Sequence, residues 1–514
     1  MAYYICKWLD GDQYIHKKDY ETNLKNLLEL YTHKYYTYKY NTCEYNMRRL
    51  FIMFIGREKE LNFLTKRYQT IGFDFIPIYG RRRVGKTELI QEFIKDKPAI
   101  IYSATEQNDK ISLSDISEQV SQFFLGTTGI QFESWDKLFV FMGEHLTTEK
   151  LIFVIDEYPY LCKNNPSLSS ILQKHMDHTF QEKNIMIILC GSSMSFMEHQ
   201  VLGYNSPLYG RRTGQIKLLP FDYQSAGEFI QEEDPVQKML LFAVADGIPQ
   251  YLKYLGKSSS LEEGIVDNFF EITGHLFEEP SSLLKQELRE PANYFSILLA
   301  ISLGKSKLNE IAAYSDLENT TCSKYLKSLM DLRIIEREVP VGNTQKKNGI
   351  YKIADNCFCF WFRFVKKYMT NIEFGNGSNV WNMIKEKYLT TYMGMVFEKA
   401  SQQYLLNHIE QLPIMPIEIG RWWGNNPIKK CQEEIDILAI SSEKEAIFGE
   451  CKWKNEKLDM SVLENLLRKS ELFPQYEMKY YYFFSKSGFT NEVKEYANTH
   501  KNIYLISLEE MYSI

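Results

Sequence analysis

The chain has 514 residues and a formal net charge of −6, with 44% hydrophobic and 25% charged residues. This length exceeds a single compact core, so several domains are expected. The apolar runs are far shorter than the ~20 residues of a membrane helix, and the negative charge argues against a general nucleic-acid coat.

Nine cysteines are scattered along the chain without a CxxC pair. The N-terminus also lacks a basic segment followed by an apolar one, which is the pattern of a secretory signal. These features indicate a cytoplasmic protein with reduced thiols and no membrane partner.

Residues 1–52 are rich in Tyr and Lys and show no clear period. Two interpretations stay open for them. They form either a poorly ordered extension or an over-extended gene start, in which case Met53 is the first residue.

After Met53, short apolar runs alternate with longer helical stretches, which is the pattern of a parallel sheet covered by helices. The predicted strands are residues 75–79, 99–102, 151–155, 185–190 and 216–219. Residues 221–285 show no strand pattern and are predicted to be helical.

Residues 80–87 fit the pattern GxxxxGK[ST] between an apolar strand and a helix. Such a loop wraps phosphates with backbone N–H groups, and the helix N-terminus adds a favourable dipole. Lys86 is expected to reach the β- and γ-phosphates, and the Thr87 hydroxyl to bind Mg²⁺. The pattern predicts an ATP site with Mg²⁺, formed by Gly80, Arg81, Arg82, Arg83, Val84, Gly85, Lys86 and Thr87.

The strand 151–155 leads into Asp156 and Glu157. We expect Asp156 to hold Mg²⁺ and Glu157 to polarise the attacking water. The strand between the loop and this acidic pair, together with Glu157, predicts the additional-strand class of P-loop ATPases.

Two further polar groups are candidates for the γ-phosphate. Ser192 or Ser193 follows the next buried strand and is a candidate sensor, or else caps a helix. Arg211 and Arg212 are candidate arginine fingers, acting in cis or from a neighbouring copy in a homo-oligomer, or else form surface ion pairs.

The loop GRRRVGKT, the strand end IDE and the segment SPLYGRRTG, with residues 54–61, resemble the archaeal-type ATPase family, a group of AAA+-related STAND ATPases that often act as nucleotide switches. The resemblance covers about residues 54–255. It implies that Gly56, Arg57 and Glu58 lie near the adenine. It also implies that residues 247–249, which end at Pro249, are a lid motif that touches the base.

Residues 290–355 predict three helices, at about 292–302, 307–314 and 320–332, followed by a hairpin at 333–339 and 349–353. This is the order of a winged helix, whose third helix enters the major groove of DNA. Candidate DNA contacts are therefore Lys324 and Lys327 on the third helix and Lys346 and Lys347 on the wing. Packing between domains is the alternative role.

The last region has predicted strands at 434–440, 445–453, 479–485 and 502–507. With a turn centred near Glu443, Asp436 lies opposite Glu450, close enough for both to share one Mg²⁺. Lys452, on the same face as Glu450, is placed to position or activate a water. A surface cluster of charges is the alternative interpretation.

This acidic pattern and the element order resemble the PD-(D/E)XK nuclease core, and the region resembles the DUF234-type domain that is commonly fused to archaeal-type ATPases. The resemblance implies an accessory acid, for which Glu398 is the candidate. Ile435 stands where the pattern often has proline.

We therefore predict an α/β multidomain protein: an extension (1–52), a P-loop ATPase core (53–220), a helical lid (221–288), a winged helix (289–372) and a nuclease-like domain (373–514). The leading hypothesis is an ATP-dependent switch that controls a nuclease acting on DNA. The alternatives are a regulator with an inactive C-terminal docking domain, and a motor that remodels proteins.

Overall fold

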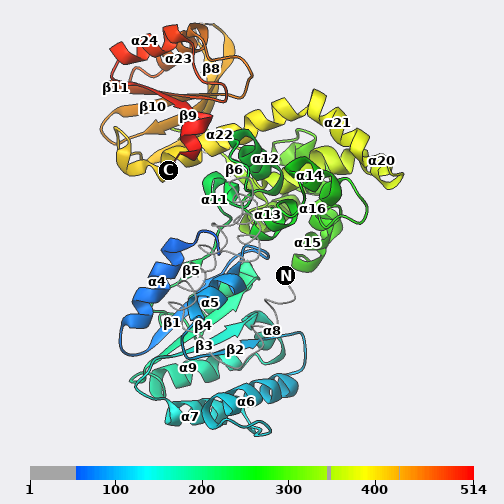
Figure 1. Ribbon diagram of the computed structural model, residues 1–514, viewed down its shortest axis with the longest axis vertical. Helices are drawn as coiled ribbons and strands as arrows, with labels where there is room; N and C mark the ends of the chain where they lie inside the picture. The colour runs from blue at the N-terminus through cyan, green and yellow to red at the C-terminus, as the bar shows by residue number, and fades with distance from the viewer. Residues whose placement is uncertain (1–53, 344–348, 428, 514) are drawn as a thin grey trace, which may run out of the picture. The chain divides into compact units, whose positions relative to one another are not determined.

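The computed structural model describes residues 54–343, 349–427 and 429–513, and Figure 1 shows its ribbon. Residues 56–514 form one compact unit. The proposed extension 1–52 with its alternative start at Met53, and the wing residues Lys346 and Lys347, lie outside the described residues.

The first sheet is parallel and has the order β2-β3-β4-β1-β5. Its strands are β1 (Asp74–Tyr79), β2 (Ala99–Ser103), β3 (Leu151–Asp156), β4 (Ile185–Gly191) and β5 (Ile216–Lys217). An additional strand, β4, separates β1 from β3, as the predicted class requires. Strands β1, β3 and β4 are buried along their whole length because helices cover both faces of the sheet.

Helices lie on both faces of this sheet (Figure 1). They are α4 (Glu58–Gln69), α5 (Lys86–Ile94), α6 (Asp109–Leu125), α7 (Trp135–His145), α8 (Tyr158–Asn164), α9 (Leu168–His178), α10 (Met194–Phe196) and the π-helical turn η1 (Met197–Val201). Asn108 and Ser134 cap α6 and α7 by accepting the first free backbone N–H groups. The strand residues Phe75, Phe153 and Ile187 belong to one hydrophobic core with side chains of α6, α7 and α9.

The region after β5 is helical, as predicted. Its helices are α11 (Tyr223–Gly227), α12 (Pro235–Ala245), α13 (Pro249–Leu255), α14 (Leu261–Phe269) and α15 (Glu279–Glu287). Helix α12 is buried from Met239 to Ala245, which places it at the centre of this helical layer.

The three predicted helices and the hairpin follow. They are α16 (Pro291–Ser302), α17 (Leu308–Tyr314), α18 (Asn319–Asp331), β6 (Ile335–Glu338) and β7 (Ile350–Ile353), and β6 and β7 pair antiparallel. One side of α18 is buried at Cys322, Leu326 and Leu329, while Lys324 and Lys327 are exposed.

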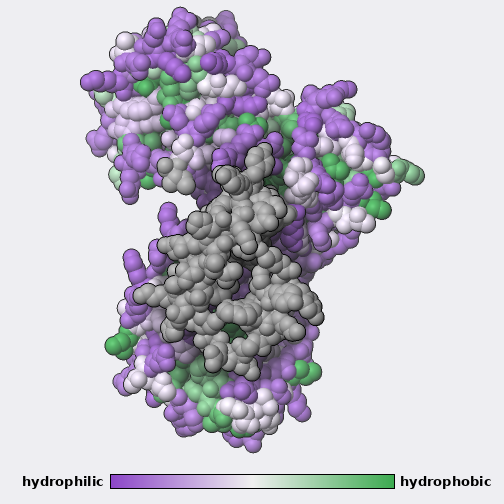
Figure 2. All heavy atoms as spheres, viewed as in Figure 1, coloured by the Kyte–Doolittle hydropathy of each residue, from purple (hydrophilic) through white to green (hydrophobic). Residues whose placement is uncertain are grey.

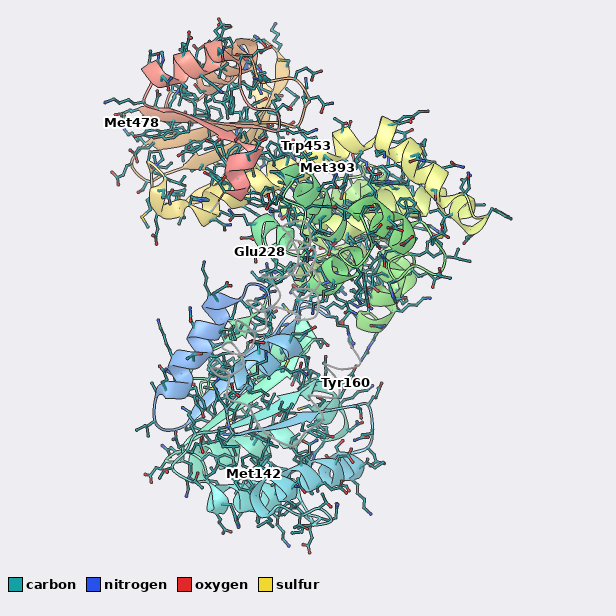
Figure 3. All side chains as sticks on the ribbon, in the orientation of Figure 1. Met142, Tyr160, Glu228, Met393, Trp453 and Met478 are labelled. Atoms are coloured by element: carbon teal, nitrogen blue, oxygen red, sulfur yellow. The ribbon has the colours of Figure 1, made fainter. Side chains whose placement is uncertain are left out.

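A second helical layer connects the hairpin to the last sheet. It contains α19 (Asn356–Phe360), the π-helical turn η2 (Trp361–Val365), the 3-10 turn η3 (Lys366–Tyr368), α20 (Met369–Glu373), α21 (Gly377–Lys387), α22 (Leu389–Asn407) and the 3-10 turn η4 (Ile409–Gln411). Helix α22 packs on both its helical neighbours and the last sheet. Tyr392 donates to the carbonyl of Ala243, and the rings of Phe397 and Trp453 are in contact at an angle of 57°, with centroids 5.3 Å apart. Trp453 and Met393 of this region are labelled in Figure 3.

The last sheet has the order β12-β11-β10-β9-β8. Its elements are β8 (Glu418–Asn426), β9 (Cys431–Ile440), β10 (Glu445–Lys452), α23 (Met460–Ser470), β11 (Met478–Ser485), α24 (Asn491–Thr499), β12 (Ile503–Ser507) and α25 (Leu508–Tyr512). Strands β8, β9 and β10 pair antiparallel, whereas β10, β11 and β12 pair parallel. Helices α23 and α24 supply the crossovers that parallel pairing demands.

Two details of the strands differ from the sequence prediction. Strand β8, with the sequence EIGRWWGNN, was not predicted, because its glycines and asparagines disfavour strands and its apolar residues do not alternate with polar ones. Strand β5 ends at Lys217, two residues early, because Pro220 follows closely and cannot donate to a ladder.

The surface carries hydrophobic side chains in small groups among hydrophilic ones on the face drawn in Figure 2. In the part of the chain that the structure describes, none of the helices is long and apolar enough to cross a membrane.

Candidate functional site: a phosphate loop and a distant acidic cluster

The phosphate loop lies between β1 and α5, and glycine is needed at both of its ends. Gly85 has a φ of +90°, and a side chain at Gly80 would stand 2.4 Å from the carbonyl oxygen of Leu218. Lys86 is buried, and its Nζ donates to the carbonyl oxygens of Gly80 (3.0 Å) and Arg81 (3.2 Å). The ammonium group is therefore held inside the loop, where a bound phosphate could replace the two carbonyl oxygens as its partner.

Thr87 and Asp156 meet at the edge of the sheet. The Thr87 hydroxyl donates to Asp156 Oδ2 at 2.8 Å, although 69 residues separate the two. A hydroxyl and a carboxylate at this distance are a suitable oxygen donor set for Mg²⁺, which takes few protein ligands beside phosphate oxygens. The geometry fits the cofactor that the motif implies.

Glu157 lies next to Asp156 and has a φ of +51°. Its Oε2 accepts hydrogen bonds from the hydroxyl (2.9 Å) and the backbone N–H (3.3 Å) of Ser192. Between the two sensor candidates, Ser192 is therefore the one in contact with Glu157. Ser193 precedes α10 without capping it through its side chain.

Arg57 and Pro249 border the loop from other elements. Arg57 donates to the carbonyl oxygens of Val84 (3.1 Å) and Leu219 (2.8 Å), and its guanidinium stacks on the ring of Phe221. Pro249 begins α13, and its Cγ lies 3.6 Å from the position of a Cβ added at Gly85. The two segments expected near the base thus converge on the loop.

The two candidate finger arginines have partners of their own within this chain. Arg211 forms a bidentate ion pair with Asp177 of α9, with both distances 2.7 Å. Arg212 donates to Gln215. The geometry matches the ion-pair alternative for Arg211 in the state described.

The partners of the three loop arginines were not predicted, and all of them are acids far along the chain. Arg81 pairs with Asp355, Arg83 pairs with Glu279, and Arg82 Nε donates to Glu287 at 2.6 Å. Burial alone lowers the pKa of Arg81, but the nearby Asp355 raises it above its ordinary value. A run of three arginines inside a phosphate loop was the available signal, although it does not reveal the partners.

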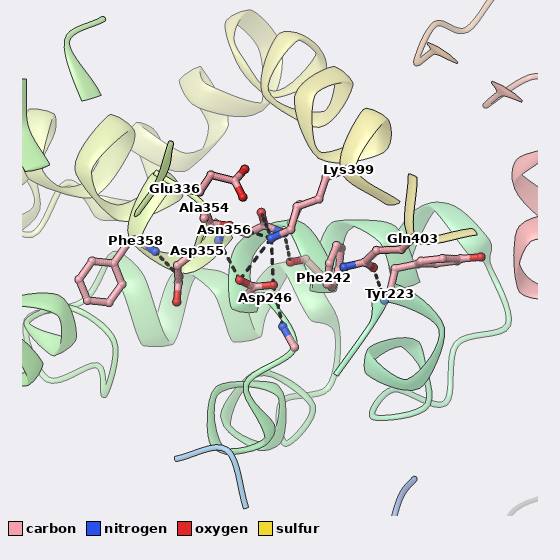
Figure 4. A network of polar contacts seen from close by, with 12 residues as sticks. Tyr223, Phe242, Asp246, Glu336, Ala354, Asp355, Asn356, Phe358, Lys399 and Gln403 are labelled. Carbon is pink, nitrogen blue, oxygen red and sulfur yellow. Dashed lines mark hydrogen bonds and ion pairs between the residues drawn. The ribbon is translucent and has the colours of Figure 1, made fainter. Parts of the chain in front are cut away.

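Asp355 is one end of a polar network that continues to α22 (Figure 4). The adjacent Asn356 donates its backbone N–H to Asp246 (3.1 Å), and Lys399 of α22 lies 3.4 Å from the same carboxylate. Lys399 also donates to the carbonyl oxygen of Ala354 at 2.7 Å. The network therefore connects the end of β7, the end of α12 and the middle of α22.

The acidic cluster of the last sheet forms where the middle of β9 lies beside the end of β10. Ile437 pairs with Gly449, so the register is the one predicted from a turn centred at Glu443, and Asp436 follows opposite Glu450. The Cys451 N–H donates to Asp436 Oδ2 at 2.8 Å. Gln402 of α22 donates to the backbone carbonyl of Asp436 at 3.2 Å, so this helix reaches the cluster.

Two lysines form hydrogen bonds and ion pairs with the carboxylate of Glu450. Lys452 Nζ donates to Oε1 at 2.6 Å, and Lys469 Nζ donates to Oε2 at 3.2 Å. Lys469 comes from α23 and was not predicted. Because both oxygens are paired with ammonium groups, Glu450 is charge-compensated without a metal ion.

Glu398 of α22 is near enough to Asp436 for the two charges to interact. Burial, with the neighbouring charge of Asp436, raises the pKa of Glu398 to about 8. Burial, with the charge of Glu450, raises the pKa of Asp436 to about 6. Arg421 of β8, a second residue that sequence reasoning missed, pairs with Glu434 and lies 3.7 Å from Glu398.

A metal ion needs ligands that stand together. Among residues 54–343, 349–427 and 429–513, no group of three or more His, Cys, Asp or Glu side chains is arranged to hold one. In the described state, the cluster of Asp436, Glu450 and Glu398 resembles a charge-balanced set with lysines more than a ready metal centre.

Comparison with known proteins places this chain. Residues 54–255 match a family model described as "ATPase domain predominantly from Archaea", and residues 361–464 match one described as "Archaea bacterial proteins of unknown function", DUF234. Over 446 residues the chain is 35% identical to an uncharacterized protein of Methanocaldococcus jannaschii, a match that covers 84% of this chain and 94% of that protein. The chain belongs to the same family. This archaeal-type ATPase is also 46% identical over 46 residues, 9% of its length, to 78% of an uncharacterized ATP-binding protein of that organism.

Solved structures offer more distant likenesses. The Walker-type ATPase PABY2304 of Pyrococcus abyssi has a TM-score of 0.47 and 22% identity, covering 60% of this chain and 96% of its own. The Orc2 protein of Aeropyrum pernix has a TM-score of 0.42 and 15% identity, covering 62% and 95%. The assignment rests on the family matches and not on these similarities.

Proposed function

We propose that this archaeal-type ATPase binds and hydrolyses ATP with Mg²⁺ as a switch, and that the nucleotide state is transmitted to its C-terminal domain. Within the loop, Lys86 exchanges its carbonyl partners for the β- and γ-phosphates. Mg²⁺ would be held by Thr87 and Asp156 and would neutralise developing phosphate charge. Glu157, oriented by Ser192, positions the attacking water.

The observation that carries the switch is the polar connection from the phosphate loop to α22. Arg81, the second residue of the loop, pairs with the buried Asp355, and the next residue, Asn356, leads through Asp246 to Lys399. Three residues further along α22, Gln402 holds the carbonyl of Asp436. A shift of the loop backbone on phosphate binding therefore acts on the helix that supports the C-terminal cluster.

Hydrogen exchange of the full chain, with and without ADP or a non-hydrolysable ATP analogue, tests this function. We expect nucleotide to change the protection of residues 389–407, and Lys86→Ala to abolish the change along with nucleotide binding. The exposed Lys95→Ala is the matched control. Nucleotide binding without any change in α22 would contradict the switch while leaving the ATP site intact.

The target of the switch is proposed to be a C-terminal nuclease acting on DNA that α18 holds as the recognition helix of a winged helix. Lys324 and Lys327 are exposed on this helix and free to meet phosphates. Mg²⁺- or Mn²⁺-dependent cleavage of DNA should be lost in Asp436→Ala and Lys452→Ala, while ATP binding survives. Lys457→Ala is the control, because it removes the same charge as Lys452→Ala at an exposed residue outside the cluster.

A C-terminal docking domain without nuclease activity is the second candidate. It is favoured by the two lysines on Glu450, since a metal ion would have to displace at least one of them. Absence of cleavage of any nucleic acid, with every nucleotide and with both metals, would decide for docking.

A further inference from the structure

Arg82 holds a distinctive position among the three loop arginines. Its Nε donates to Glu287 at 2.6 Å, and its Nη2 donates to the hydroxyl of Tyr160 at 3.0 Å. Arg81 is buried in its pair with Asp355, whereas 30% of the Arg82 side chain is exposed. Arg83 is 22% exposed in its pair with Glu279, so Arg82 is the most exposed of the three loop arginines, and its two partners lie on different elements.

The partners of Arg82 lie beside the residues that are expected to meet the γ-phosphate. Tyr160, labelled in Figure 3, belongs to α8, which begins directly after Glu157. Burial raises the pKa of Glu287, and this carboxyl also senses the charges of Arg82, Glu157 and Lys86. Glu287 thus places a negative charge within electrostatic reach of both the loop lysine and the catalytic glutamate.

We infer that Arg82 is a γ-phosphate contact supplied in cis, and that Glu287 of α15 holds it in the absence of nucleotide as a substitute for that phosphate. A guanidinium fork fits either a carboxylate or a phosphate. Because one anion replaces another, the guanidinium stays paired throughout the exchange, whereas the buried carboxyl of Glu287 loses its partner and has to take up a proton or water. ATP, but not ADP, supplies the competing anion, so only ATP releases α15 from the loop.

This inference rests on the proposed ATP site but assigns a role that the loop motif does not contain. It also accounts for the arginine requirement of phosphoryl transfer without Arg211, whose fork is already occupied by Asp177. The device makes the end of the helical layer, at Glu287, sensitive to the third phosphate.

The test is the affinity of the full chain for ADP and for the analogue AMPPNP, measured by calorimetry with Mg²⁺. A charge-assisted hydrogen bond contributes about 1.5–3 kcal/mol, so Arg82→Ala should weaken AMPPNP binding by roughly 10- to 150-fold and ADP binding less than about threefold. Glu287→Gln should strengthen AMPPNP binding several-fold and leave ADP unchanged. Lys110→Ala and Glu118→Gln, which change exposed residues of α6, are the controls.

Equal changes for both nucleotides would overturn the inference and leave Arg82 as a tie between the loop and α15. Arg82→Lys guards against a folding defect, since it keeps the charge and should retain part of the discrimination. If the wild-type protein binds both nucleotides and Arg82→Ala binds them equally well, this inference alone is refuted. Wild-type protein that binds neither nucleotide refutes it together with the ATP site.

Discussion

At the end of β3, Asp156 and Glu157 face neutral hydroxyl donors from Thr87 and Ser192. Near the end of β10, Glu450 faces two ammonium groups. Hydroxyl groups leave carboxylates charged and available to a cation or a water, whereas ammonium groups compensate the charge directly. The same residue types are therefore prepared for chemistry in one place and balanced in the other.

The acids of the C-terminal cluster also repel one another. In the C-terminal cluster, burial and mutual repulsion raise the pKa values of Glu398 and Asp436 to about 8 and about 6. Near neutral pH such a pair retains a proton, which lowers its attraction for a divalent cation. If the C-terminal cluster binds a metal ion, as proposed, it therefore has to lose this proton first, and the proposed switch would be one way to bring that about.

Glu157→Gln is expected to have the largest effect on the chemical side of this comparison. The variant keeps an oxygen that can accept the hydrogen bond from Ser192 but removes the carboxylate that we propose to position and polarise water, so turnover should fall by roughly 10²- to 10⁴-fold. Steady-state phosphate release measures the change, and nucleotide affinity should stay within a few-fold of the wild type. Turnover equal to that of the wild type would remove Glu157 from the mechanism.

The buried pair of Arg81 and Asp355 provides the next largest effect. Asp355→Ala strands a buried guanidinium, and removal of one partner of such a pair costs about 3–5 kcal/mol. Replacing both partners, as in Arg81→Met with Asp355→Leu, should restore much of the stability. Urea denaturation measures both variants.

The double variant also separates stability from transmission. If the pair carries the nucleotide signal, hydrogen exchange in α22 should no longer respond to ADP even though the protein is stable again. A response of wild-type size in the double variant would show that the signal takes another route.

The features that the sequence predicted correctly are those set by residues close together in the chain. The phosphate loop is contiguous, and its spacing with Asp156 and Glu157 follows from strand and helix geometry, so residue types alone indicated the site. The turn at Glu443 likewise gave the correct register for Ile437 and Gly449.

Contacts between distant elements were beyond sequence reasoning. Arg81 and Asp355 are 274 residues apart, and no periodic pattern links them. Lys469 lies on the exposed-looking last turn of α23, and Arg421 belongs to β8, whose glycines concealed the strand. These residues are decided by which helix packs on which sheet, and that depends on the summed burial of the whole unit.

The raised pKa of Glu398 predicts a moderate effect on the dependence of stability on pH. The folded state holds a proton on this carboxyl up to about pH 8, whereas the unfolded chain releases it near 4.5. Wild-type stability should therefore fall as pH rises between these values, because the native state binds more protons. Glu398→Gln should flatten this fall and be more stable than the wild type at pH 8, by between about 1 and 3 kcal/mol.

Urea denaturation at pH 5 and pH 8 measures this difference, and Glu410→Gln, on an exposed side chain, is the control. A gain for Glu398→Gln that is the same at both pH values would point to packing and not to the buried proton.

The smallest expected effect concerns α18, the helix that we propose to bind DNA. If Lys324 and Lys327 contact phosphates, replacing each by alanine should weaken DNA binding only a few-fold and reduce the slope of log affinity against log salt by up to about 0.9. Fluorescence anisotropy with duplex DNA at several salt concentrations measures this slope, with Lys494→Ala on α24 as the control. An unchanged slope in both variants would assign α18 to packing between domains. Any DNA on which the C-terminal domain acts would then have to be bound by other elements.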